Sequence, residues 1–363
     1  MTPHPFQKKV FFSDVLHSAN RRGMWSYRNQ LFLHFSSVCN VNVLMNGFKS
    51  NILNLFAHEF IEPFKRWVRS KPSNIVVFPY NILPFLDLGC SQKILVVLDI
   101  IFMNPAYTDF INTYRRKFII SSLYRADFII TISEDVKGQL LTLCPGLKIF
   151  VVPCCLRNDF EHARLNATSV INKNKSSETF IIFHFGGTSQ SKQTELLLKA
   201  VSQLVKSGIS VNLRLAAMSS SVAQEWVRAL MLTFGIPTTN VTLLPRLSDE
   251  QLYNELVTAD CHCMPSLSEG FGIPIIEAAY AGCPNILSPI NVFSEILGDN
   301  ALYFDEWTVN ALCITLMDVY KNPEKDLKLI TEKAKCVAEK YTFELIHKHK
   351  FIPLWDEICS EIH

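Results

Sequence analysis

Short runs of β-branched and aromatic residues recur along the chain, and the longer stretches between them repeat apolar residues every three or four positions. The short runs are typical of buried strands, and the longer stretches are typical of amphipathic helices. Their alternation predicts parallel sheets, because consecutive parallel strands are joined by crossover helices. The strands expected in the first half are residues 9–12, 41–45, 75–78, 94–98, 128–132 and 149–152.

A break in this pattern divides the chain. From residue 157 to residue 178 asparagine, serine and lysine predominate, which is typical of an exposed linker or a long surface loop. Strands are then expected again at residues 180–185, 211–216, 241–244, 261–264 and 285–287. We therefore predict two α/β domains, at 1–165 and 179–342, joined by a linker at 166–178. A terminal helix at 343–363, kinked at Pro353, is expected to pack back toward the first domain.

Charge distinguishes the two halves, although the formal net charge of the 363 residues is only +2. Residues 1–165 contain 19 Lys and Arg against 11 Asp and Glu, whereas residues 166–363 contain 16 against 22. A basic first half indicates an anionic surface or substrate, and membrane lipid and nucleic acid are both open at this point.

The compartment is indicated by apolar runs and cysteines. No apolar run reaches the roughly 18 residues that cross a bilayer, and the first residues lack the apolar stretch of a secretion signal. The eleven cysteines show neither zinc-site nor redox-motif spacing. We therefore expect a cytoplasmic protein with reduced thiols.

The stretch that is most informative about chemistry is PSLSEGFGIPIIEAAYAGCP, residues 265–284. It follows an expected strand and combines a glycine loop with the start of a helix. Gly270 and Gly272 allow close approach of a ligand to the backbone, and Pro274 suits a first helical turn. Free N–H groups at such a helix start attract a phosphate or a sugar hydroxyl.

Two carboxylates flank this loop. Glu269 precedes it and Glu277 lies within the following helix, so that one ligand along the loop can touch both. A carboxylate accepts hydroxyl hydrogen bonds in a fixed geometry, which suits ribose and hexose diols. The alternative is that Glu269 only caps the helix and that Glu277 is a solvated surface residue.

The whole string resembles glycosyltransferase family 4, the large retaining family with the GT-B fold. That family's signature is Pro-Ser, then Glu-Gly-Phe-Gly-x-Pro-x-x-Glu-Ala, then Ala-x-Gly-x-Pro, and residues 265–284 match every position. The resemblance continues through residues 294–305 and, more weakly, over nearly the whole chain. It implies two Rossmann-like doubly wound domains facing across a cleft, and a bacterial enzyme of the surface-polysaccharide type.

The resemblance also implies roles for the motif residues. Glu269 corresponds to the glutamate that contacts the transferred sugar and Glu277 to the glutamate that holds the ribose of a nucleotide diphosphate sugar. Retention implies that the acceptor hydroxyl attacks from the side on which the diphosphate leaves, with charge stabilised by dipoles and cations. The backbone amides implied to face sugar and phosphate are those of Gly270, Phe271, Gly272 and Ile273.

Three further donor-binding residues follow from the resemblance. Residues 183–192 resemble the family's glycine-basic loop, with Gly187 in the loop and Lys192 as the phosphate-binding lysine. Arg246 lies where relatives place a loop near the nucleotide base, although a solvated arginine before a helix capped by Ser248 is an equal alternative. Gly23 resembles the glycine turn that closes over the diphosphate.

The chain departs from the family pattern near residue 98. Many relatives have a His-Asp pair at a strand end, where this chain has Leu98 and Asp99, so that Asp99 is kept as a catalytic candidate on the acceptor side. Paired carboxylates for a metal in the form Asp-x-Asp do not occur in the sequence. We therefore predict no metal and no cofactor beyond the nucleotide sugar itself.

The expected partners are the donor and a glycan or lipid-linked acceptor. Residues 60–71 and 114–118 mix aromatic residues with cations, which indicates either contact with an anionic membrane at the inner face or ordinary packed helices. Nucleic acid is not expected, because no recognition motif accompanies the basic half. A soluble acceptor, as in glycogen- or sucrose-type synthases, and a non-catalytic sugar-nucleotide-binding scaffold remain the alternatives.

Overall fold

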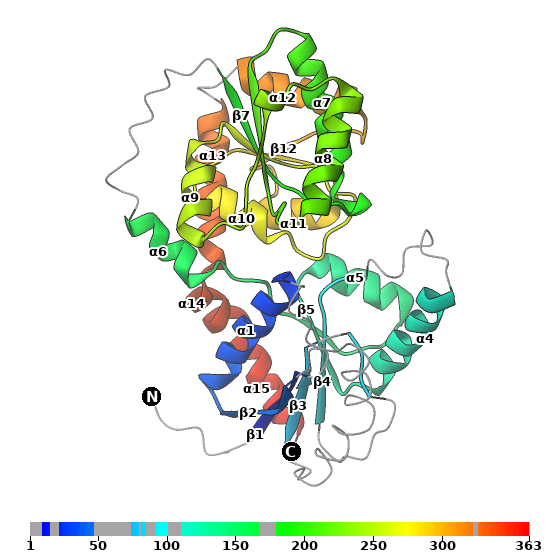
Figure 1. Ribbon diagram of the computed structural model, residues 1–363. Helices are drawn as coiled ribbons and strands as arrows, with labels where there is room; N and C mark the ends of the chain where they lie inside the picture. The colour runs from blue at the N-terminus through cyan, green and yellow to red at the C-terminus, as the bar shows by residue number, and fades with distance from the viewer. Residues whose placement is uncertain are drawn as a thin grey trace. The chain divides into compact units, whose positions relative to one another are not determined.

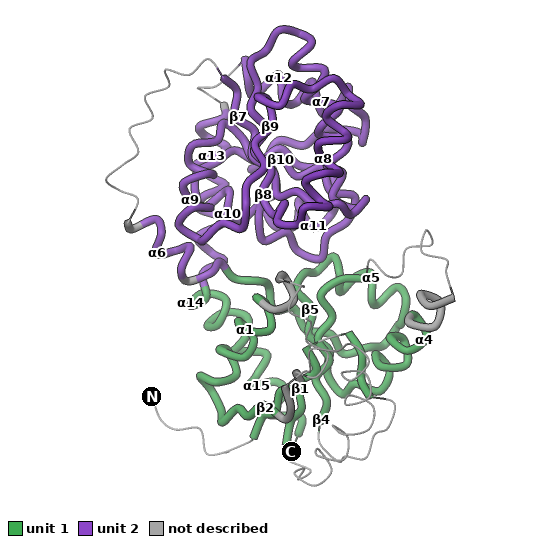
Figure 2. The backbone as a smooth tube through the Cα atoms, viewed as in Figure 1, with its two compact units in different colours: residues 1–155, 343–363 green, residues 156–342 purple. Residues whose placement is uncertain are grey.

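The computed structural model of the protein describes residues 9–14, 22–46, 74–79, 81–84, 92–100, 110–166, 179–321 and 326–362. The chain divides into two compact units, which Figure 2 draws in different colours. The first unit comprises Met1–Cys155 together with Phe343–His363, and the second comprises Leu156–Thr342. Each unit contains one parallel β-sheet, as the alternation of strands and helices predicts.

The sheet of the first unit has the strand order β2-β1-β3-β4-β5-β6, and every neighbouring pair is parallel. Figure 1 shows α1 and α15 on one side of this sheet and α4 and α5 on the other. The strands are β1 (Lys9–Asp14), β2 (Asn40–Asn46), β3 (Ile75–Phe78), β4 (Gln92–Val97), β5 (Phe128–Thr131) and β6 (Ile149–Val151). The helices are α1 (Arg22–Ser36), α4 (Phe110–Arg125), α5 (Glu134–Leu143), α14 (Phe343–Ile346) and α15 (Ile352–Glu361).

Helix α1 packs against both strand β1 and the C-terminal helix α15. Tyr27, Leu31 and Phe35 recur every four residues, so that they share one face of the helix, and all three are buried. Phe35 contacts Phe12 of β1 at a ring-centroid distance of 5.8 Å and Trp355 of α15 at 5.5 Å. The C-terminal helix is therefore part of the core of the first unit.

The end of the chain is helical but interrupted, as the proline predicts. A π-helical turn, His347–Phe351, separates α14 from α15. Pro353 lies in the first turn of α15, two residues after this π-helical turn.

Two histidines, His34 of α1 and His347 of the π-helical turn, lie next to each other. Nδ1 of His34 in α1 lies 3.0 Å from Nδ1 of His347, and the two rings are stacked. His34 is 1% exposed and also stacks on Phe343. Burial, and after it the neighbouring His347, lower the pKa of His34 to about 3, and burial lowers the pKa of His347. The pair is therefore neutral in the folded unit at neutral pH.

We expect acid to loosen the C-terminal helix of the first unit. The pKa of His34 is lower in the folded state than the roughly 6.5 of an unfolded chain, so the stability is present above that value and is lost as the pH falls toward about 3. Between pH 7 and pH 5 the loss amounts to about 2 kcal/mol. Hydrogen exchange of the α15 amides at both pH values measures it. His34→Phe removes the titrating group, and an equally large loss in that variant would contradict the assignment.

The sheet of the second unit has the strand order β12-β11-β10-β7-β8-β9, again entirely parallel. Its core gathers the inward residues of α7, α8 and α12 on one face, and Figure 1 shows α9, α10 and α13 toward the other. The strands are β7 (Phe180–Phe185), β8 (Val211–Ala216), β9 (Val241–Leu243), β10 (Cys261–Met264), β11 (Asn285–Leu287) and β12 (Leu302–Tyr303). The helices are α6 (Asn158–Asn166), α7 (Thr194–Lys206), α8 (Ser221–Phe234), α9 (Asp249–Thr258), α10 (Ile273–Tyr280), α11 (Asn291–Leu297), α12 (Val309–Lys321) and α13 (Asp326–Ala338).

The prediction that residues 157–178 form an exposed linker is wrong for its first part. Helix α6 occupies Asn158–Asn166, and its fully buried Phe160 contacts Tyr253 and Tyr280 at ring-centroid distances of 5.5 and 6.2 Å. This packing assigns the helix to the second unit, so that the division falls after Cys155 instead of after residue 165. Residues 167–178 lie outside the described part of the chain.

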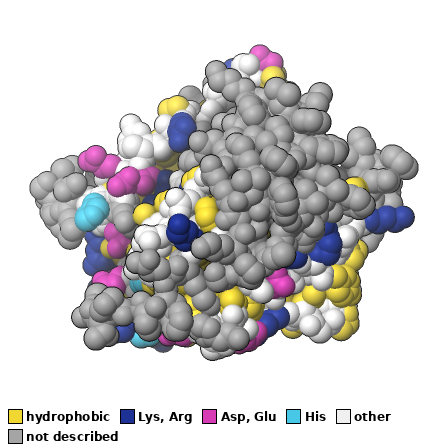
Figure 3. Space-filling model, turned by 90° about the horizontal axis from the view of Figure 1, so that it is seen from below, with side chains coloured by type: hydrophobic (Ala, Val, Ile, Leu, Met, Phe, Trp, Pro, Cys, Tyr) yellow, Lys and Arg dark blue, Asp and Glu magenta, His cyan; other side chains and the backbone are white. Residues whose placement is uncertain are grey.

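The membrane prediction concerns the first unit. Residues 60–71 lie outside the described residues, whereas Arg116 and Lys117 lie in α4, with Lys117 exposed. In the view of Figure 3 the described Lys and Arg side chains form separate spots. None of the helices in the described ranges is both long and apolar enough to cross a bilayer. Binding to an anionic membrane surface stays a prediction.

Candidate functional site

The candidate site is built on two neighbouring strands of the second unit. From β7 the chain proceeds to β8 and β9 on one side, and it later returns to place β10 on the other side of β7. Ligands of doubly wound sheets bind where the strand order reverses, beyond the carboxyl ends of the strands. The loops that follow β7 and β10, residues 186–192 and 265–272, lie at this point.

An ion pair joins the two loops. Nζ of Lys192, after β7, lies 2.6 Å from Oε1 of Glu269, after β10, and the two side chains are 30% and 13% exposed. The Leu267 N–H donates to the Ser191 carbonyl at 2.8 Å, which holds the backbones together. Gly187 lies against the lysine stem, since a Cβ added there would lie 3.4 Å from Lys192 Cγ. Three residues that the sequence singled out thus meet in one place.

A buried histidine supports the loop after β7. His184 is fully buried, and burial lowers its pKa to about 3, so that the ring is neutral. Its Nδ1–H donates to the Cys263 carbonyl at 2.8 Å, and its Nε2 lies 3.2 Å from the Thr194 hydroxyl. That hydroxyl donates to the Gly187 carbonyl at 2.9 Å. The glycine of the loop is therefore anchored to the neighbouring strand through uncharged groups.

The glycine loop after β10 turns directly into helix α10. Gly272 is the N-cap residue with φ +100° and ψ 52°, a left-handed conformation that favours glycine, and Pro274 follows in the first turn. Free backbone N–H groups at such a helix start carry partial positive charge. Because Gly272 is the cap, the alternative that Glu269 caps this helix is wrong. Phe271 is buried and contacts Tyr341 at a ring-centroid distance of 5.6 Å.

Glu277 lies inside α10 and is 2% exposed, so the alternative of a solvated surface residue is also wrong. Nε and Nη2 of Arg157 donate to its Oε1 at 3.0 and 2.8 Å, and Nη1 of the same arginine pairs with Asp249. Burial raises the pKa of Glu277, and Arg157 opposes that shift. Burial likewise raises the pKa of Asp249 against the effect of Arg157.

Comparison with known proteins places this geometry in a family. Residues 167–335 match the model of the family described as Glycosyl transferases group 1. This part of the chain belongs to the group 1 glycosyltransferases.

Curated relatives of the chain carry glycosyltransferase names. It is 22% identical over 234 residues to the O-antigen chain mannosyltransferase B of Escherichia coli, covering 64% of this chain and 61% of that protein. It is 44% identical over 63 residues to the O-antigen chain mannosyltransferase RfbU of Salmonella typhimurium, covering 17% of this chain and 18% of that protein. The chain thus aligns with less than two thirds of the length of each.

Solved structures match over nearly the whole chain. A sucrose-phosphate synthase from Thermosynechococcus elongatus superimposes with a TM-score of 0.71 at 16% identity, covering 98% of this chain and 100% of that one. WaaG, described as a glycosyltransferase involved in lipopolysaccharide biosynthesis, superimposes with a TM-score of 0.67 at 14% identity, covering 94% and 98%. Both matches show the fold, and the predicted GT-B fold is confirmed.

Three further residues expected to bind the donor or the acceptor lie apart from the ion pair in the sequence. Arg246 is exposed in the loop before α9, and Ser248 caps that helix with Gln251, as its alternative interpretation predicts. Gly23 lies in the first turn of α1. Asp99 is half-buried just beyond the carboxyl end of β4. Their predicted contacts with donor or acceptor stay predictions.

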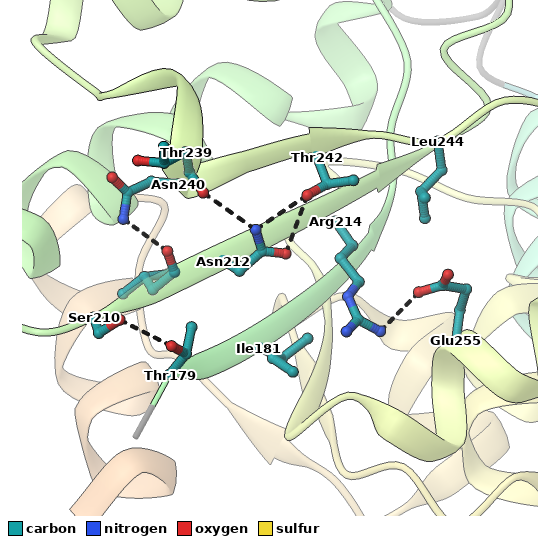
Figure 4. Close-up of a pocket in the computed structure, with 11 residues that line it drawn as sticks. Thr179, Ile181, Ser210, Asn212, Arg214, Thr239, Asn240, Thr242, Leu244 and Glu255 are labelled. Carbon is teal, nitrogen blue, oxygen red and sulfur yellow. Dashed lines mark hydrogen bonds and ion pairs between the residues drawn. The ribbon is translucent and has the colours of Figure 1, made fainter. Parts of the chain in front are cut away.

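A cavity of about 590 Å³ lies elsewhere in the second unit (Figure 4). Its walls come from the first residues of β7, β8 and β9 and from α9, and Figure 4 shows Arg214 directed at Glu255. None of the predicted site residues lines this cavity. The cavity is therefore distinct from the loops at the carboxyl ends of β7 and β10.

Sequence reasoning missed Arg157 altogether. It lies 120 residues from Glu277, in a stretch that reads as a polar linker. No local signal marks Arg157, because the burial of Glu277, which makes a cation necessary, is a property of the folded unit.

Proposed function

We propose that this protein is a retaining glycosyltransferase that moves a hexose-type sugar from a nucleotide diphosphate sugar to a glycan or lipid-linked acceptor. The observation that carries the proposal is the Lys192–Glu269 pair, held beside the glycine turn of α10 at the point where the strand order reverses. It combines a cation for the diphosphate, a carboxylate for sugar hydroxyls and, for both, the backbone amides at the start of α10.

The charges of the site suit such a donor. A lysine ammonium has three N–H donors, so Lys192 can hold Glu269 and still donate to diphosphate oxygens. The amides of residues 270–273 at the start of α10 add partial positive charge for the same anion. Glu269 then accepts hydrogen bonds from hydroxyls of the transferred sugar, and Glu277 accepts them from the ribose.

The proposed reaction retains the configuration of the sugar. A bond forms between the acceptor oxygen and the anomeric carbon while the bond from that carbon to the diphosphate oxygen breaks on the same face. The acceptor proton passes to the departing diphosphate. Lys192 and the amides of α10 stabilise the leaving charge, so that we propose a reaction without a metal ion.

The acceptor class is proposed from relatives and charge. The two O-antigen chain mannosyltransferases and WaaG carry names or descriptions from surface-polysaccharide synthesis. The basic residues 1–165 suit an acceptor at an anionic membrane. We therefore propose that the protein acts in the cytoplasm, at or near the inner face of the membrane, in surface-polysaccharide or glycolipid synthesis.

A donor screen tests the proposal. Wild-type protein is incubated with UDP-, GDP-, ADP- and dTDP-sugars, GDP-mannose among them, with and without lipid acceptors, and free nucleoside diphosphate is measured. We expect release from one nucleotide class, lost in Glu269→Gln. Release that persists in the variant would place the chemistry elsewhere. Tight nucleotide binding without any release would favour the non-catalytic scaffold.

A further inference from the structure

Arg157 divides its hydrogen-bond donors between two carboxylates, those of Glu277 and Asp249. Two of its nitrogens reach the same oxygen of Glu277, at 3.0 and 2.8 Å, while the third pairs with Asp249. Within the described part of the chain, Oε2 of Glu277 takes part in no hydrogen bond or ion pair. The arginine therefore fixes the carboxylate through one oxygen and leaves the other, with two lone pairs, to accept hydroxyl hydrogen bonds.

The backbone of Arg157 is held as firmly as its side chain. Its carbonyl accepts from the N–H groups of Phe160 and Glu161, both at 3.0 Å, so that Arg157 is fixed directly before the first turn of α6. The residue before it, Leu156, donates to the Tyr341 carbonyl at 2.8 Å. Arg157 is thus preorganised, although its side chain is 36% exposed.

Glu277 needs this partner in order to carry a charge. A carboxylate that is 2% exposed loses most of its hydration, so burial favours the neutral acid. Asp249 on the far side of the arginine favours the neutral acid as well, and Arg157 is the group that opposes both. A protonated Glu277 would keep one acceptor fewer and would lose the charge that strengthens its hydrogen bonds.

We propose that Arg157 is a positioning residue for the nucleotide, which keeps Glu277 ionised and directs its second oxygen to the ribose hydroxyls. The inference rests on the proposed function, since it takes Glu277 as the ribose ligand. Arg157 lies near the start of the second unit, outside the glycine motif, and in this proposal it contributes to the selectivity of the site for ribose hydroxyls. Asp249 has the opposite influence, because it competes for the same guanidinium.

The test measures selectivity for ribose hydroxyls. UDP and GDP, and their 2′,3′-dideoxy counterparts, are titrated into the full chain by calorimetry at a series of pH values. In wild type the natural nucleotide binds at least about tenfold more tightly than its dideoxy form, as a charge-assisted hydrogen bond implies. That preference disappears at low pH as Glu277 becomes protonated.

The variants are expected to move this pH profile in opposite directions. In Arg157→Gln the pH at which the ribose preference is half lost rises, and in Asp249→Asn it falls. Affinity for the dideoxy form stays unchanged in both. In Arg157→Lys, which keeps the charge, the pH at which the preference is half lost lies between the values for wild type and Arg157→Gln. Arg214→Gln is the matched control, since Arg214 also pairs with a glutamate at 2.8 Å but lines the separate cavity, and it leaves the profile unchanged.

The outcomes separate this inference from the proposed function. If Arg157→Gln weakens both nucleotide forms equally, or leaves the pH profile in place, Arg157 has only a structural role and the inference fails. If wild type binds nucleotides without preferring ribose, Glu277 is not the ribose ligand, and the inference fails while the donor site stands. Absence of any nucleotide binding overturns both. Should Arg157→Gln not fold, Arg157→Lys and Asp249→Asn still decide, because their profiles must shift in opposite directions.

Discussion

Glutamine at position 269 is expected to lower kcat for the donor that the wild type uses by about 10²- to 10³-fold. The substitution keeps the shape of the side chain but removes the charge that pairs with Lys192. In the proposed mechanism this charge also stabilises positive charge on the reacting sugar. Binding of the nucleoside diphosphate is expected to be no weaker than in wild type, because Lys192 then has no carboxylate competing with the phosphates. Steady-state kinetics and calorimetry measure the two quantities.

A matched control makes this result specific. Glu255 also pairs with a cation, Arg214 at 2.8 Å, and lies in the same unit beside the separate cavity of Figure 4. Glu255→Gln is expected to keep the wild-type kcat. Equal losses in both variants would indicate general damage to the unit, and an undiminished kcat in Glu269→Gln would remove Glu269 from the mechanism.

Alanine at position 272 is expected to destabilise the second unit by about 3 kcal/mol. The φ of +100° costs an L-residue about 1–2 kcal/mol. A Cβ at this position would also lie 2.8 Å from Cε1 of the fully buried Phe293 ring, and overpacking of this kind adds about 1–3 kcal/mol. Urea denaturation followed by circular dichroism gives the free energy of unfolding.

Gly282 provides the comparison for this prediction. Its φ is +73°, but no atom lies within 4 Å of a Cβ added there. Gly282→Ala therefore incurs only the backbone strain, about 1 kcal/mol. If Gly272→Ala lowers the free energy of unfolding by no more than Gly282→Ala, the Phe293 ring moves aside without a cost in free energy. The close packing of the loop on α11 would then not contribute to stability.

Local pattern was sufficient for most of the fold. The strands expected from β-branched and aromatic runs are present in both units, because a strand buried on both faces must be apolar along its length. Two elements, β12 and α6, were not predicted from the sequence. Strand β12 is only Leu302–Tyr303, too short for a periodic signal, and α6 carries so many polar residues that only its packing through Phe160 on Tyr253 reveals a helix.

The sequence by itself determined the glycine turn and singled out the two glutamates and the lysine, because these lie in short contiguous motifs, one with its own local conformation and both with a resemblance to a known family. Only the tertiary structure decided which cation meets which carboxylate. Lys192 reaches Glu269 across 77 positions and Arg157 reaches Glu277 across 120. Such contacts depend on strand order and on the packing of α6, which residue periodicity does not encode. Burial, which decides whether Glu277 needs a partner at all, is likewise a property of the folded unit.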